Sequence, residues 1–142
     1  MKIRQRGVAL VEFAFVLPLL LVLSLASTEL GRAVYRYNTT AKAVRDAVRY
    51  LSVQTPGTHV TEARNLIVYG NVAGTGPMLD TALSAANVPV PTWQSTGSNP
   101  LINTVTIRVS GYRFQPLITN MFGTQFGAIT FNDISATMRS PL

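Results

Sequence analysis

The residue of this sequence best suited to do chemistry is Glu12, a carboxylate inside an apolar stretch near the start of the chain. It is the fifth residue after Gly7 and the only charged residue between Val8 and Thr28. A carboxylate within a bilayer costs roughly 2–3 kcal/mol on insertion scales, so it requires a proton or a partner. We interpret Glu12 as a contact for a partner; a protonated or snorkelling side chain without a role is the alternative.

The other polar residues form no catalytic or metal-binding pattern. His59 is the only histidine and cysteine is absent, so no ligands stand at metal-binding spacing. The glycine-rich stretch 70–77 lacks the Gly-Lys-Ser/Thr ending of a phosphate loop. Asp80 and Asp133 are too isolated to be proposed as an acid/base pair. The sequence therefore predicts a protein that is not an enzyme, with no cofactor, metal or small-molecule substrate.

Glu12 is carried by an apolar segment long enough to cross a membrane. As a helix, Val8 to Ala26 would rise about 28 Å, close to the thickness of the hydrocarbon core of a bilayer. A core helix is the alternative, but a helix that is apolar on every face would need a larger protein around it. We expect a transmembrane anchor at residues 8–27, preceded by a basic leader at residues 1–7.

The helix is expected to continue beyond the anchor, because no helix stop follows Ala26. Residues 28–53 form an amphipathic extension that ends before Pro56 and Gly57. Its apolar residues follow the 4-3-4-3 spacing of a packed helical seam: Leu30, Val34, Tyr37, Ala41, Val44, Val48 and Leu51. We expect this stripe to pack on the chain's own sheet; a helix of another subunit is the alternative.

Residues 54–142 are expected to form a small α+β module. Its elements would be a helix with Thr61 as N-cap, a loop at 70–77, an extended segment at 88–91, and strands at 103–114 and 129–139. Up to one helical turn is expected between the two strands. Two or three strands are unstable alone. The predicted fold class is therefore α+β, a pilin-like arrangement in which a long N-terminal helix packs on a small antiparallel sheet.

The net charge of +6 does not indicate nucleic-acid binding. Many basic residues flank the apolar segment, which is typical of membrane proteins: Lys2, Arg4, Arg6, Arg32, Arg36 and Lys42. The basic residues after position 50 are too scattered for a patch with interleaved aromatic residues. The expected partner is membrane lipid, and no nucleic acid is expected.

The N-terminal pattern resembles the type IV prepilins and, more closely, the TadE-like pseudopilins of the Tad (tight adherence, Flp-type) pilus. The resemblance is carried by GVALVEFAFVLPLLLVL, by TELGRAVYRYNTTAKAVRDAVRY, and by the C-terminal stretches TVTIRVSGYRFQPL and ITFNDISATMR. It implies a minor pilin-like subunit with a structural or assembly role in adhesion. The major Flp pilin is a much shorter, nearly all-helical chain.

This resemblance also implies roles for individual residues. A prepilin peptidase would cleave after Gly7 and leave Val8 as the new N-terminus. In assembled pilins, a carboxylate at the position of Glu12 contacts the N-terminal amine of a neighbouring subunit. The expected partner contacts are Glu12, Phe13 and Pro18, although the simplest interpretation of Phe13 is an apolar side chain that faces lipid. Pro18 removes a helix hydrogen bond and can kink the helix.

The expected partners are therefore the prepilin peptidase and other pilins or pseudopilins of the same machinery. The expected location is the inner membrane, crossed once. The N-terminus would be cytoplasmic before processing, and residues 54–142 would be extracytoplasmic.

The main alternative is a secreted binding module whose signal peptide is cleaved after Ala26. Glu12 argues against it, because a signal peptide needs no carboxylate in its apolar region. The continuous helical pattern across Ala26 argues against it too. The two interpretations differ in the mature N-terminus, which is Val8 in the first and Ser27 in the second.

Overall fold

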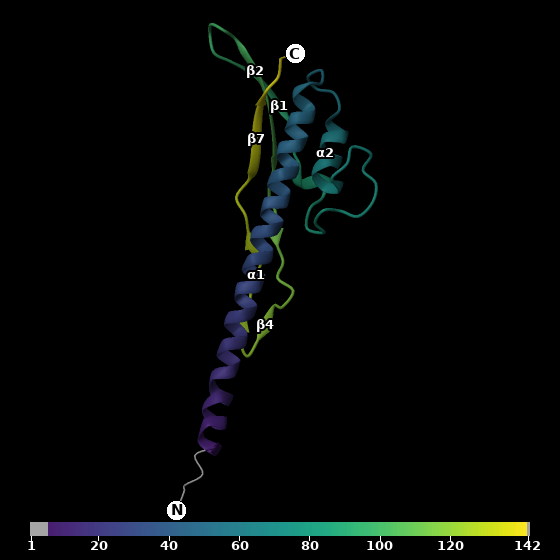
Figure 1. The fold of residues 1–142 in the computed structure, drawn as a ribbon. Helices are drawn as coiled ribbons and strands as arrows, with labels where there is room; N and C mark the ends of the chain where they lie inside the picture. The colour runs from purple at the N-terminus through teal and green to yellow at the C-terminus, as the bar shows by residue number, and fades with distance from the viewer. Residues whose placement is uncertain (1–5, 142) are drawn as a thin grey trace, which may run out of the picture.

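One helix, α1 (Arg6–Ser52), runs along almost the whole molecule in the computed structural model, which describes residues 6–141. Its 47 residues correspond to a rod about 70 Å long, and the other elements lie mainly beside its C-terminal half (Figure 1). The helix continues without a break through the boundary expected near residue 27. The prediction of one continuous helix is therefore confirmed to within two residues at each end.

The short helix α2 (Val60–Tyr69) follows α1 after a turn and packs against it. The predicted N-cap, Thr61, is wrong, because the residue before the helix is His59 in a left-handed conformation, with φ 56°. The helix ends at Gly70, which is also left-handed and whose N–H bonds to the Leu66 carbonyl. The next segment contains only the 3₁₀ turn η1 (Ala85–Asn87).

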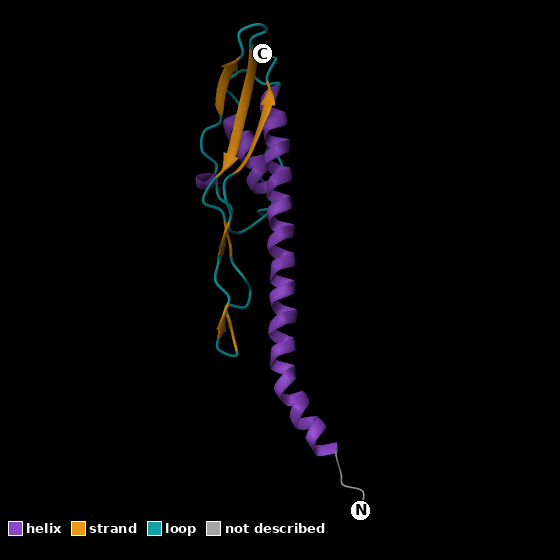
Figure 2. Ribbon diagram, turned by 90° about the vertical axis from the view of Figure 1, so that its left-hand side faces the viewer, coloured by secondary structure: helices purple, strands orange, loops and turns teal. Residues whose placement is uncertain are grey.

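A three-stranded antiparallel sheet covers one side of α1. Its order is β1 (Thr92–Thr96), β2 (Ile102–Val109) and β7 (Ile134–Arg139) (Figure 2). On β2, the alternating residues Val105, Ile107 and Val109 are all buried and form the inward face of the strand. On β7, Ile134 is buried, whereas Met138 is 36% exposed at the end of the strand.

Both predicted strands are interrupted. Gly111, at φ 67°, separates β2 from β3 (Arg113–Phe114), and a short stretch separates β6 (Ile129–Thr130) from β7. β3 pairs with β6. The expected helical turn between the strands is wrong: β4 (Asn120–Met121) and β5 (Thr124–Gln125) form a hairpin there. The two residues between them, Phe122 and Gly123, both have positive φ, as a tight hairpin turn requires.

The core lies between α1, α2 and the sheet, so the α+β class with a helix packed on a small antiparallel sheet is confirmed. Only part of the predicted stripe on α1 enters this core. Val44, Val48 and Leu51 are buried, whereas Leu30 is 60% and Val34 is 51% exposed. A 3.5-residue repeat drifts about 20° per heptad around a straight helix, so it drifts about 60° over the three heptads from residue 51 to residue 30. The buried face there belongs instead to Glu29, Ala33 and Thr40.

Candidate functional site

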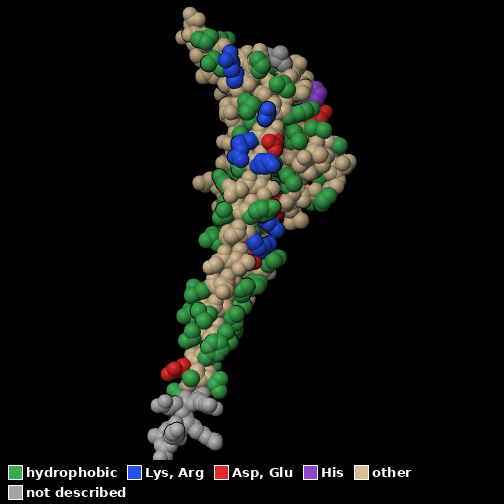
Figure 3. Space-filling view, viewed as in Figure 1, with side chains coloured by type: hydrophobic (Ala, Val, Ile, Leu, Met, Phe, Trp, Pro, Cys, Tyr) green, Lys and Arg blue, Asp and Glu red, His purple; other side chains and the backbone are tan. Residues whose placement is uncertain are grey.

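The N-terminal half of α1 is an apolar helix that the rest of the described chain leaves uncovered. Its most apolar 18-residue window has a mean hydropathy of 2.6, and none of that window is buried inside the molecule. Figure 3 shows hydrophobic side chains along this part of the rod, while Lys and Arg side chains gather further up, beside the module. A helix with these properties is long and apolar enough to cross a membrane, and the lack of cover excludes a core helix.

Gly7, Val8 and Glu12 lie together at the exposed start of α1. Val8 and Glu12 are four residues apart, so they share a helix face with a rise of about 6 Å between them. Glu12 makes no hydrogen bond or ion pair with any residue within the described range 6–141. Gly7 belongs to the first helical turn, which must unwind before a protease can extend the backbone there. The preceding leader residues 1–5 lie outside the described residues.

Phe13 and Pro18 are also carried by the uncovered helix. Phe13 is 56% exposed and contacts no part of the core. Pro18 is the proline inside α1, and the helix continues through it. The N-terminal end of α1 bends away from the axis of the rest of the helix (Figure 2). We attribute this bend to Pro18, whose ring removes the hydrogen bond to the Ala14 carbonyl.

A buried polar cluster that the sequence does not reveal joins α1 to the module. Asp80, 5% exposed, accepts hydrogen bonds from the Arg36 guanidinium at 3.0 Å, from the Ala82 N–H at 2.9 Å and from the Tyr112 hydroxyl. Burial raises the pKa of Tyr112 above its ordinary range, and the hydrogen bond to Asp80 raises it further. The members of this cluster are joined by hydrogen bonds to Asp80, so we interpret the cluster as structural. Asp133, by contrast, is exposed.

A second polar contact lies closer to the anchor. Glu29 is 8% exposed and pairs with Arg32 at 2.7 Å. The Leu117 N–H donates to Glu29 Oε1 at 3.3 Å. This contact fixes the chain just before β4 against α1. The Phe114 ring lies 5.6 Å from the guanidinium carbon of Arg32 and also of Arg36, so both polar contacts surround the same buried aromatic ring.

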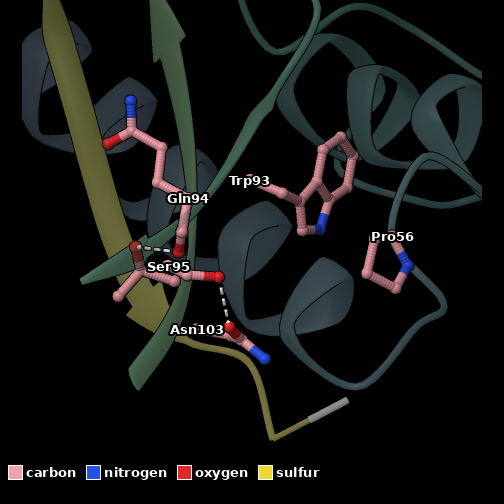
Figure 4. Close-up of a pocket in the computed structure, with 6 residues that line it drawn as sticks. Pro56, Trp93, Gln94, Ser95 and Asn103 are labelled. Atoms are coloured by element: carbon pink, nitrogen blue, oxygen red, sulfur yellow. Dashed lines mark hydrogen bonds between the residues drawn. The ribbon is translucent and has the colours of Figure 1, made fainter. Parts of the chain in front are cut away.

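A hollow of about 210 Å³ lies beside Trp93, near the turn that follows α1 (Figure 4). Trp93 packs against the core, but its indole Nε1 has no partner within the described residues. The Ser95 hydroxyl donates to Asn103 Oδ1 at 2.7 Å, and both side chains line the hollow. No charged or metal-ligating side chain lines it, so it offers no catalytic group. Over residues 6–141, no three His, Cys, Asp or Glu side chains gather as a metal site would require.

Residues 7–49 match the TadE-like protein family. The matched segment contains the apolar helix with Gly7, Val8 and Glu12, together with most of the amphipathic extension. The resemblance to TadE-like pseudopilins is therefore confirmed over this segment. No curated protein and no solved structure matches the chain.

Proposed function

We propose that this chain is a minor pilin-like subunit of a Tad-type pilus, cleaved after Gly7 by a prepilin peptidase and assembled with other pilins through its N-terminal helix. The TadE-like match indicates a pilin-like role, in a family of structural pilus components rather than enzymes. The family also implies contact with other pilus components. Cleavage, the peptidase and the particular contacts are the parts that we propose.

The observation that carries the proposal is the position of Glu12 on an uncovered apolar helix. Cleavage after Gly7 would free an amine on Val8, one helical turn from this carboxylate. In the structure, the side chains of Val8 and Glu12 are both exposed on the same helix face. A carboxylate in a bilayer is stabilised by a positive partner. The amine of a neighbouring subunit would supply this charge and bring two anchors together.

The proposed topology places the leader in the cytoplasm, residues 8–27 of α1 across the inner membrane, and the module outside. The basic leader agrees with the tendency of basic residues to remain on the cytoplasmic side. The unbroken course of α1 also favours an anchor over a signal peptide, because cleavage after Ala26 would remove almost half of the helix. Phe13 and Pro18 would then lie in the bilayer, where they face lipid or the neighbouring helix.

The test is a Glu12→Ala substitution in cells that contain the chain's own pilus machinery. The variant is expected to insert and to be cleaved normally, because neither the apolar length nor Gly7 changes. It is expected to lose co-purification with partner pilins at least tenfold. Glu62→Ala, at a glutamate on α2 far from the anchor, is the matched control and should co-purify normally. Unchanged co-purification of Glu12→Ala would exclude the proposed contact.

A further inference from the structure

The β4–β5 hairpin lies beside the anchor half of α1 and away from the main sheet. Figures 1 and 2 both show it running back along the helix toward the N-terminal end. Two positions pair across it, Asn120 with Gln125 and Met121 with Thr124. The Phe126 N–H closes the hairpin by bonding to the Thr119 carbonyl at 2.9 Å. Although the hairpin belongs to the module in sequence, it is level with part of the apolar helix.

The segment that contains this hairpin is uncharged. No Lys, Arg, Asp or Glu occurs from Gln115 to Asn132. Leu117 is 76% exposed and Phe122, at the turn, is 65% exposed. An uncharged loop with an exposed phenylalanine at its turn is costly to hydrate and suits contact with lipid.

The base of the hairpin is fixed against the helix just above the anchor. The Leu117 N–H bonds to Glu29, and a cavity of about 300 Å³ separates Phe126 from Ala26 and Leu30. From Leu117 the strand can extend about 16 Å to Phe122, at about 3.3 Å per residue. This length equals about 11 residues of helix, so Phe122 reaches at most the level of Pro18. The turn therefore lies between the levels of Glu29 and Pro18, that is, on the extracytoplasmic side of the middle of the expected span.

We propose that the β4–β5 hairpin is a second membrane contact, with Phe122 inserted at the boundary between headgroups and acyl chains of the extracytoplasmic leaflet. The occupant of this surface is lipid, because any bilayer crossed by α1 up to Ser27 also surrounds the tip of the hairpin. The proposal depends on insertion of α1 but not on cleavage or assembly.

The depth of insertion is limited by the backbone of the hairpin. The interior of a bilayer cannot satisfy unpaired N–H and C=O groups, so an open two-stranded hairpin is excluded from the centre. The exposed polar side chains of Asn120, Thr124 and Gln125 also favour the headgroup layer. The hairpin thus sets the distance between the module and the membrane surface, and the rotation of the module about the axis of α1.

The absence of cysteine from the chain allows a direct test with single labels. Phe122→Cys, Leu101→Cys and Val16→Cys would each be made in the full chain, labelled with a fluorophore and reconstituted into phosphatidylcholine/phosphatidylglycerol vesicles. Leu101 is the matched control, because it is 61% exposed in the β1–β2 connection at the opposite end of the sheet. Val16, near the middle of the apolar segment, is the reference for a deep position.

Nitroxide lipids with the quencher near the headgroup or deep in the acyl chain then measure the depth of each label. The label at position 122 is expected to be quenched at least threefold more than that at 101, and more by the shallow quencher than by the deep one. The label at 16 is expected to show the opposite preference. Equal quenching at 122 and 101 overturns the proposal. Protection of position 122 from both lipid and aqueous quenchers would indicate a protein partner and overturns it as well. Lack of quenching at 16 would show that α1 is not inserted, and the proposal would then fail together with the anchor.

Discussion

Arg36 and Asp80 are 44 positions apart in the sequence, yet the guanidinium of Arg36 donates to the carboxylate of Asp80 at 3.0 Å. This pair joins the middle of α1 to the loop between α2 and the sheet. Tyr112, which is buried, donates to the same carboxylate from the segment that follows β2. Three separate parts of the chain therefore meet at Asp80, which fixes the module relative to the helix that carries the anchor.

Asp80→Ala is expected to lower the free energy of unfolding by about 2–4 kcal/mol, because it leaves a buried hydroxyl and a guanidinium without their acceptor. The Arg36 side chain keeps 30% exposure, so the cost is smaller than for a fully buried pair. Denaturation of the full chain in detergent micelles, followed by the fluorescence of the single tryptophan, Trp93, measures the change. Asp133→Ala, at an exposed aspartate, is the control and should change stability by less than about 0.5 kcal/mol. Equal effects of the two substitutions would contradict the role of Asp80.

Tyr112 makes the stability depend on alkaline pH. Because its pKa is raised in the folded state, the folded chain keeps the phenol proton above pH 10, where the unfolded chain loses it. The stabilisation is fully present below pH 10 and is lost as the pH rises further. Tyr112→Phe should cost about 1 kcal/mol at pH 8, through the lost hydrogen bond. The stability difference between the wild type and the variant should narrow above pH 10. A difference that stays constant from pH 8 to pH 11 would count against this assignment.

Gly7 and Gly31 provide a matched pair of glycines on α1. Both are exposed, and no atom lies within 4 Å of a Cβ built at either position. Leucine should therefore fit at both and favour the helix by up to about 1 kcal/mol. We expect Gly7→Leu to remain uncleaved and Gly31→Leu to be processed as the wild type is. Intact-mass spectrometry of the membrane-extracted chains distinguishes the two results. Normal cleavage of Gly7→Leu would show that the peptidase does not require a glycine there.

The sequence predicts the long helix and the core strand well because both depend on local periodicity. Other features depend on how a helix face turns relative to the rest of the fold, or on contacts between distant residues, and could not be predicted in this way. The lower part of the helical stripe, from Leu30 to Val34, leaves the core because a heptad pattern drifts around a straight helix. Asp80 looks isolated in sequence because its partners come from α1 and from the segment after β2.

The hairpin tip illustrates the same limit. Asn120 to Gln125 has neither a long alternating pattern nor an Asn-Gly turn, so nothing local predicted two paired strands there. One signal was available, namely the complete absence of charge from Gln115 to Asn132. In a chain with an apolar anchor, an uncharged loop of this length is a reason to ask whether it also meets the membrane.

Cleavage after Gly7, in the first turn of the helix that carries Glu12, is the step on which the proposed role of the chain depends. The most direct test is N-terminal sequencing of the protein extracted from the membranes of cells that contain its own pilus machinery. We expect the first residue to be Val8. A first residue of Met1 would mean that the chain is an unprocessed anchor, and Ser27 would mean that it is a secreted module; either result would rule out cleavage after Gly7.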